Sequence, residues 1–172
     1  MEERPNIWKT GFSNGLIIGF VIVIYSFLLY LLELNENQFL GLFSYVILLL
    51  GIVWVHQNYK KNGDGFMRFG EGLGLGMVVS GVSGIMAGIF AILLLKVIDP
   101  NMIERITQKQ VIELQDQGMS QTQIDQTLKV MEFMQSPVLL LAMTIVGYLL
   151  FGFIISLIVS AITKKNNPAP SI

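Results

Sequence analysis

The segment from Phe69 to Val97 constrains the fold of this chain more than any other stretch. It is almost entirely apolar, and small residues recur in it at every fourth position. In water such a helix would be weak, because each interior glycine costs up to ~1 kcal/mol relative to alanine. In lipid the same stripe lets a second helix approach closely, so that dispersion contacts hold the two together. The segment therefore predicts a membrane helix that packs against other helices. The small residues of its stripe are Gly72, Gly76, Ser80, Gly84 and Gly88.

The composition is that of a membrane protein. Of the 172 residues, 53% are hydrophobic and 13% are charged, against roughly 25% charged residues in a soluble domain. Four apolar segments are long enough to cross a hydrocarbon layer of ~30 Å. We therefore expect an all-α, integral membrane four-helix bundle in a single domain over residues 1–172. The expected spans cover about residues 15–34, 39–55, 73–97 and 138–162.

Basic residues near the span ends predict the orientation of the chain. With four crossings, those of both termini and of the loop between the second and third spans lie on one side, which the positive-inside tendency places in the cytoplasm. Residues 99–137 then lie outside, and their basic residues are diluted by acidic ones. The first apolar run is expected to be an uncleaved anchor. The residues that carry this prediction are Arg4, Lys9, Lys60, Lys61, Arg68, Lys164 and Lys165.

Residues 99–137 predict an extracytoplasmic helical hairpin between spans three and four. The Asp99-Pro100 pair is expected to cap a first helix that ends at Gly118. Ser120 is expected to cap a second helix, with Gln123 in the capping-box position. The second helix has an apolar seam, which can close on the first helix or present methionine side chains to a partner. The seam residues are Ile124, Leu128, Met131 and Met134.

Small residues at four-residue spacing also occur in the first and fourth spans. One interpretation is packing within the bundle; another is that a face receives a partner's helix or a second copy of the chain. A third is that the glycine seams permit helix sliding or pore widening. The residues are Gly11, Gly15 and Gly19 in the first span, and Gly152, Ser156 and Ser160 in the fourth.

The ionisable residues near the spans have simple interpretations. Glu71 begins the third span, where a carboxylate is stabilised by the helix dipole, and it is expected to cap the helix or pair with Arg68. The alternative is a partly buried carboxylate that handles a proton or a cation. His56, the only histidine, is interpreted as part of an interfacial aromatic belt with Trp54 and Tyr59. Without cysteine or a cluster of ligands, we expect no metal and no cofactor.

Several fragments occur together in a distinctive order. They are Phe69-Gly70-Glu71-Gly72, Ile98-Asp99-Pro100, the run from Gln117 to Pro137 with Gly-Met-Ser and Met-Glu-Phe-Met, and Phe151-Gly152-Phe153-Ile154-Ile155-Ser156 followed by Lys164-Lys165. With these fragments the chain resembles the Bacteroidetes membrane-protein family catalogued as domain of unknown function 4199, over nearly its whole length. The resemblance implies four spans in a bacterial inner membrane, and it carries no activity or catalytic residue. It also suggests proximity to polyprenyl-phosphate glycosyltransferases, near which relatives tend to be encoded.

These observations favour a non-enzymatic inner-membrane subunit or accessory protein. No nucleophile-base pair, carboxylate pair or metal cluster can be assembled from the available residues. We expect the protein to dock partner membrane proteins through its small-residue helix faces and its extracytoplasmic hairpin. The expected partners are membrane lipids and another membrane protein or a second copy, and the net charge of -1 argues against nucleic acid. The alternatives are a small transporter or channel, and a membrane accessory subunit of a polyprenyl-phosphate glycosyltransferase.

Overall fold

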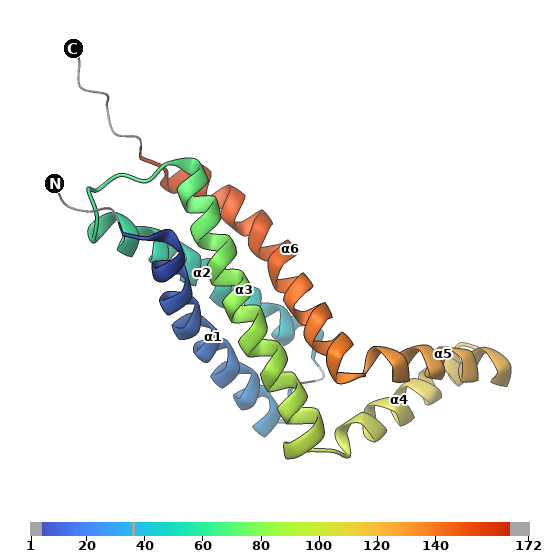
Figure 1. The fold of residues 1–172 in the computed structure, drawn as a ribbon. Coiled ribbons are helices and arrows are strands. Elements are labelled where there is room, and N and C mark those ends of the chain that lie inside the picture. Colours follow the sequence, from blue (N-terminus) through green and yellow to red (C-terminus); the bar gives the residue numbers. More distant parts are fainter. Residues whose placement is uncertain (1–4, 36, 166–172) are drawn as a thin grey trace, which may run out of the picture. The chain divides into compact units, whose positions relative to one another are not determined.

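The computed structural model describes residues 5–35 and 37–165, and its fold is all-α, as predicted (Figure 1). Four helices are long and apolar enough to cross a membrane, with mean hydropathies of 2.2 to 2.6. Large apolar side chains are exposed along all four, as is expected where lipid is the solvent. The protein is therefore a multi-pass membrane protein. The described elements are α1 (Ile7–Leu31), α2 (Gln38–Lys61), α3 (Phe69–Leu93), a π-helical turn η1 (Leu94–Ile98), α4 (Met102–Asp116), α5 (Gln121–Met134) and α6 (Pro137–Thr163).

The chain divides into two compact units. Unit 1 consists of Met1–Ala87 and Ile145–Ile172, and unit 2 consists of Gly88–Thr144. Unit 1 contains α1, α2 and most of α3 and α6. Unit 2 contains the α4–α5 hairpin with the adjoining ends of α3 and α6.

Two asparagines set the starts of the first two helices. The side chain of Asn6 accepts hydrogen bonds from the backbone N–H groups of Trp8 and Lys9, at 2.9 and 3.1 Å. Asn37 caps α2 in the same way. Because such a cap satisfies N–H groups that have no partner within the helix, α1 begins at Ile7, eight residues before the start of the predicted span. The helix is therefore longer than the span predicted over residues 15–34.

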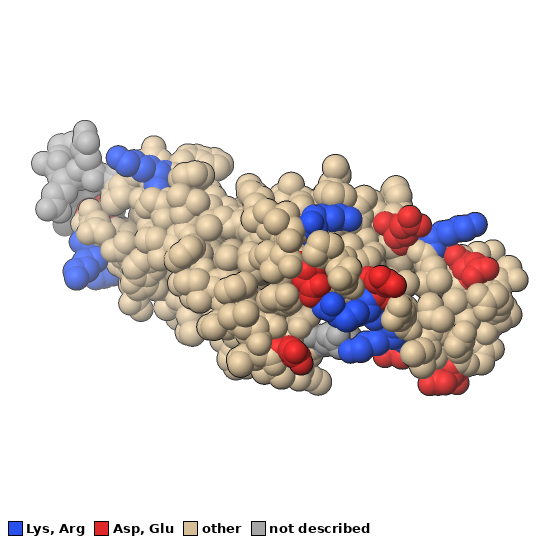
Figure 2. Space-filling view, turned by 90° about the horizontal axis from the view of Figure 1, so that it is seen from below, with Lys and Arg blue, Asp and Glu red and all other residues tan. Residues whose placement is uncertain are grey.

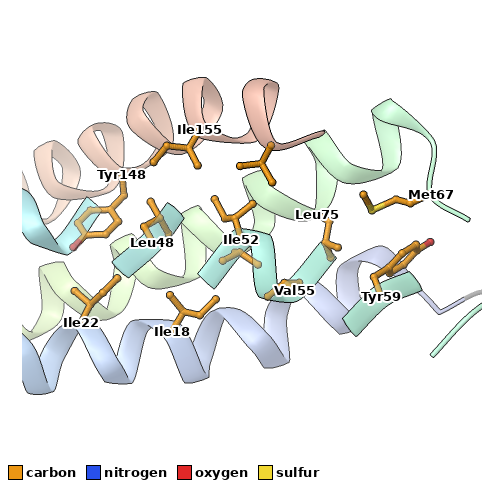
Figure 3. Close-up of a cluster of buried hydrophobic side chains, with 12 residues drawn as sticks. Ile18, Ile22, Leu48, Ile52, Val55, Tyr59, Met67, Leu75, Tyr148 and Ile155 are labelled. Atoms are coloured by element: carbon orange, nitrogen blue, oxygen red, sulfur yellow. The ribbon is translucent and has the colours of Figure 1, made fainter. Parts of the chain in front are cut away.

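The core of unit 1 is an apolar cluster to which α1, α2, α3 and α6 all contribute (Figure 3). Ile22, Leu48 and Ile52 are fully buried in it. α1 and α2 form the antiparallel pair that their short connection predicts, with Ile18 packed against Gly51. The Tyr25 hydroxyl donates a hydrogen bond of 2.8 Å to the carbonyl of Leu40 across this pair. Side chains from all four spanning helices therefore fill the centre of unit 1.

The loop between α2 and α3 holds the end of the described chain. Met67 and Lys165 exchange two backbone hydrogen bonds of 2.9 Å each. The Lys165 ammonium lies 5.4 Å from the centre of the Phe66 ring, a distance at which a cation–π attraction operates. The C-terminal end of α6 is therefore fixed to the start of α3 within unit 1.

In unit 2, the first hairpin helix starts later than predicted. α4 begins at Met102, and the Asp99-Pro100 pair lies in the turn before it. The N-cap residue of α4 is Asn101, and the Asp99 carboxylate forms an ion pair with Arg105. Gly118 ends the helix with a φ of +76°, a left-handed conformation that favours glycine. The predicted capping box is present at the start of α5, where the Ser120 N–H donates to the Gln123 side chain at 3.0 Å.

Candidate functional site

The glycines of α1 lie directly against α3. A methyl group added at Gly11 would lie 2.8 Å from Cβ of Val78, and one at Gly15 would lie 2.9 Å from Cβ of Val82. Non-bonded carbon atoms prefer 3.5 to 4.0 Å, so the two helices approach this closely only because the side chains are missing. The Ser83 hydroxyl also donates a 3.2 Å hydrogen bond to the carbonyl of Gly15. The α1 glycines that face α3 in this way are Gly11, Gly15 and Gly19.

The seam between α3 and α6 is an interlocking series of glycines and serines. At three successive levels a glycine of one helix faces a serine of the other, and the helix that supplies the glycine changes at the third level. A methyl group at Gly76, for example, would lie 2.8 Å from Cβ of Ser156. The side chains of Ser80, Ser156 and Ser160 are all fully buried, and the Ser80 hydroxyl donates a 2.8 Å hydrogen bond to the carbonyl of Gly76. The pairs are Gly72 with Ser160, Gly76 with Ser156, and Gly152 with Ser80.

The remaining small residues predicted for packing also meet neighbours inside their own unit. In unit 1, a methyl group at Gly84 would lie 2.8 Å from Cβ of Tyr148. In unit 2, one at Gly88 would lie 2.7 Å from a methyl group of Leu141. The small-residue faces singled out in the sequence are therefore occupied within the chain.

A second set of glycines on α3 is open. A methyl group at Gly70 would meet no atom within 4 Å. One at Gly74 would meet only a methyl group of Ile7 at 3.8 Å, and one at Gly81 only a methyl group of Leu149 at 3.6 Å. The small-residue stripe predicted from the sequence does not include these three glycines. They form a second series, spaced by four and seven residues, that is interleaved with the predicted stripe.

Gly74 and Gly81 line a groove of about 800 Å³ on the α1–α3 side of unit 1. Its other lining residues are apolar as well, and several are exposed: Trp8 is 74% exposed and Ile85 45%. The part of α3 that lines the groove runs from Gly74 to Ile85, about 16 Å at ~1.5 Å per residue. The described residues therefore form an apolar groove along about three turns of α3.

His56 joins three helices below the surface of unit 1. Its side chain is fully buried, so the interpretation as an interfacial belt residue is wrong. Nε2 lies 3.0 Å from the carbonyl oxygen of Gly72 on α3, and Nδ1 lies 2.8 Å from the Thr163 hydroxyl on α6. Since a carbonyl can only accept, Nε2 carries a proton and donates it to Gly72. Both ring nitrogens are therefore engaged in contacts between helices.

Lys60 extends this junction by one turn of α2. Its ammonium donates a 2.9 Å hydrogen bond to the carbonyl of Thr163, in the last turn of α6. The last carbonyls of a helix have no partner within it and carry partial negative charge. Lys60 therefore caps the C-terminal end of α6, whereas the sequence predicted that Lys60 lies in the loop after the second span.

Glu71 serves the start of α3. Its carboxylate accepts a hydrogen bond of 2.6 Å from the backbone N–H of Arg68. A glutamate at the third helical position that bonds back to the residue before the helix is one half of a capping box. The local geometry thus matches the simpler of the two interpretations of Glu71.

The hairpin seam in unit 2 is closed over part of its length. Ile124 of α5 and Met102 of α4 are buried, and Leu128 and Met131 are half-buried. Met134 is 40% exposed. The seam residues therefore become more exposed toward the end of α5, and the described methionines form no continuous exposed surface along the seam.

The described residues contain no group of three or more histidine, aspartate or glutamate side chains that could hold a metal ion. A family model described as "Protein of unknown function (DUF4199)" matches residues 13–165, in agreement with the resemblance noted from the sequence. No curated protein and no solved structure matches the chain.

Proposed function

The chain belongs to the DUF4199 family of proteins of unknown function, and from its own residues we propose that it is a non-enzymatic membrane subunit that binds a transmembrane helix of a partner protein. The observation that carries the proposal is the open glycine face of α3 in the α1–α3 groove. The partner's segment is an apolar α-helix that lies along α3 between Gly74 and Ile85. In this proposal the partner's helix covers the glycines of α3 that no described helix of this chain packs against closely.

The open glycines favour a helix over a lipid chain as the occupant of the groove. Gly74 and Gly81 are seven residues apart, so they leave the α3 backbone bare at two points about 10 Å apart at ~1.5 Å per residue. A flexible acyl chain gains nothing from bare backbone, whereas a rigid helix gains dispersion contacts and Cα–H···O contacts by close approach. Alanine would fit at both positions, so the fold of this chain does not require glycine there.

The apolar lining of the groove also indicates that the partner's helix is uncharged where it contacts α3. Among the residues that the structure describes, no charged side chain lines it, and an unpaired charge is costly inside a membrane. The partner's helix must therefore be uncharged over the three turns that it shares with α3. In a symmetric contact between two copies through this groove, the exposed Trp8 and Phe12 of both copies would lie at the interface, and the test below separates self-association from the proposal.

We also propose that the chain has no catalytic activity of its own. Both ring nitrogens of His56 contact neighbouring helices, and the Glu71 carboxylate caps α3. The transporter alternative has no comparable support: Ser80 and Ser83 donate their hydrogens to helix carbonyls, and the centre of unit 1 is filled by apolar side chains. No feature of the described residues favours a glycosyltransferase partner over another membrane protein.

For its location, we propose a bacterial inner membrane with both termini in the cytoplasm and the α4–α5 hairpin outside. The support is the distribution of basic residues. Lys9, Lys60, Arg68 and Lys165 all flank the spans of unit 1 near the α2–α3 loop and the two ends of the described chain. Lysine and arginine near span ends favour the cytoplasmic side.

A photocrosslinking experiment in native membranes tests the docking proposal. A photoreactive phenylalanine analogue is placed at Met77 in the groove, and a matched probe is placed at Ile154, which is 55% exposed on α6. We expect the Met77 probe to form an adduct with an apolar membrane helix of one other protein, identified by mass spectrometry of the crosslinked peptide. Gly74→Leu should abolish this adduct without lowering the thermal stability of the purified chain.

Three outcomes would overturn the proposal. Adducts with lipid alone would make the groove a lipid site, and adducts with this same chain would make it a surface for self-association. An adduct that Gly74→Leu leaves unchanged, or that the Ile154 probe forms equally well, would place the contact outside the groove.

A further inference from the structure

The α5 helix of unit 2 has three distinct faces. Starting from Val130 and turning ~100° per residue, the seam residues that meet α4 lie on one side, and the charged residues Asp125, Lys129 and Glu132 lie on the next. The third face contains no charge. It consists of Gln123, Gln126, Thr127, Val130, Phe133 and Met134, of which the sequence assigned Met134 to the seam.

The apolar side chains of the third face are exposed. Phe133 is 68% exposed and Val130 is 58% exposed. All three apolar members, Val130, Phe133 and Met134, lie in the last turns of α5. In water such a cluster of large side chains would be unfavourable, and clusters of this kind mark surfaces that contact a partner or a membrane.

The short connection between α5 and α6 indicates which surroundings this face meets. Only Gln135 and Ser136 separate α5 from Pro137, the first residue of a membrane-spanning helix. Ser136 is bonded to both helices, because its N–H donates to the carbonyl of Phe133 at 3.2 Å and its carbonyl accepts from Leu140 at 2.9 Å. The two-residue connection therefore keeps the last turn of α5 next to the first turn of the spanning helix α6.

We infer that the Val130–Phe133–Met134 face of α5 inserts into the head-group and acyl boundary of the bilayer that α6 crosses. The structure supplies the two elements that interfacial helices need, an exposed apolar face and a polar edge beside it. The inference is independent of the α1–α3 groove and of the side of the membrane on which the hairpin lies.

The charges of unit 2 identify the kind of lipid surface that suffices. Acidic and basic side chains are interspersed over the hairpin (Figure 2), and unit 2 contains four basic and six acidic residues, a formal net charge of -2. A polybasic segment would draw binding energy from anionic lipid, but this one has no positive excess. Insertion is therefore driven by apolar contact, and a zwitterionic bilayer is enough.

Single-cysteine labelling tests the inference, because the chain has no cysteine of its own. The variants Val130→Cys and Phe133→Cys carry a nitroxide label at the apolar face, and Glu132→Cys carries it at the charged edge. The full-length protein is reconstituted into phosphatidylcholine vesicles, and collisions of the label with oxygen and with a water-soluble nickel chelate are measured by electron paramagnetic resonance. Labels in lipid meet oxygen more often, and labels in water meet the chelate more often.

We expect oxygen collisions to exceed chelate collisions at positions 130 and 133, and the ratio to reverse at position 132. The result should not change when phosphatidylglycerol is added or when the salt concentration is raised tenfold. A label at position 133 that meets the chelate as often as the one at 132 would overturn the inference, because the face would then lie in water. Low collision rates with both reagents at 130 and 133 would also overturn it, because the face would then be covered by protein.

Discussion

Replacing Gly76 by alanine adds one methyl group to the seam between α3 and α6. That methyl group would lie 2.8 Å from Cβ of Ser156 and 3.4 Å from a methyl group of Ile52. A Cβ atom is fixed to its backbone, so Ser156 cannot turn away and the two helices must shift apart. Overpacking of this kind typically destabilises a core by ~1–3 kcal/mol.

Gly74→Ala is the matched control, two residues away on the same helix. Its methyl group would meet only Ile7, at 3.8 Å, which is an ordinary contact distance. Both substitutions gain the same helix propensity, up to ~1 kcal/mol, so this contribution cancels when the variants are compared. The free energy of unfolding of Gly76→Ala should therefore lie about 1–3 kcal/mol below that of Gly74→Ala.

A double-mutant cycle with Ser156→Gly then localises the effect. Removing the Ser156 side chain opens the space that the new methyl group needs, so Gly76→Ala should cost less in that background. The coupling energy between the two positions should be at least ~0.5 kcal/mol, as expected for residues in contact. The corresponding coupling between Gly74→Ala and Ser156→Gly should be near zero.

The measurement is reversible unfolding in mixed micelles with an increasing fraction of sodium dodecyl sulfate, followed by circular dichroism. Equal free energies of unfolding for the Gly76→Ala and Gly74→Ala variants, within ~0.5 kcal/mol, would refute the reasoning. The seam between α3 and α6 would then have room for a side chain, and glycine would not be what brings the helices together.

Further substitutions test the junction, the hairpin and the start of α3. His56→Leu removes two hydrogen bonds between helices and should lower the free energy of unfolding in the same micelles by about 1–3 kcal/mol. Thr163→Val removes only one of these two bonds and should lower the free energy of unfolding by less. Equal losses for the two variants would contradict the assignment of two inter-helix hydrogen bonds to His56. Gly118→Ala places a side chain on a φ of +76° and should cost ~1–2 kcal/mol, seen as faster amide hydrogen exchange in α4 and α5 with unchanged exchange in α2. Glu71→Gln keeps the backbone-capping acceptor and should change stability by less than ~1 kcal/mol, and a larger loss in the same unfolding assay would mean that the charge itself is needed. A cysteine in place of Asp116 should react with a membrane-impermeant maleimide added to intact spheroplasts if the hairpin lies outside the cytoplasm, and reaction only after lysis would reverse the proposed orientation.

The spanning helices could be predicted from the sequence, but the end of α2 could not. Hydropathy falls at His56, and the predicted span therefore stopped at Val55, although α2 continues to Lys61. His56 and Lys60 can remain in the helix because Gly72 and Thr163 satisfy their polar groups. One of these partners is 107 residues away in sequence, and no local pattern reveals such a contact.

The glycine pattern identified close helix packing but not its partners. Gly72, Gly74 and Gly76 occupy alternate positions, and the spacing of the glycines alone does not tell which of them packs against another helix. In the structure Gly72 and Gly76 meet α6, whereas Gly74 faces the groove. Which set is covered depends on where the other helices lie, and that information is not local to the segment.

The position of α3 explains why one set of glycines stays open. At ~100° per residue, three sides of α3 are taken within unit 1: Val78 faces α1, Gly72 faces α2 and α6 at His56 and Ser160, and Gly84 faces α6 at Tyr148. Gly74 and Gly81 lie on the remaining side. A bundle of four spans has no further helix to place there, yet two glycines keep the backbone of that side bare. Because bare backbone in a membrane lets another helix approach closely, the docking proposal assigns this side of α3 to a helix of another molecule.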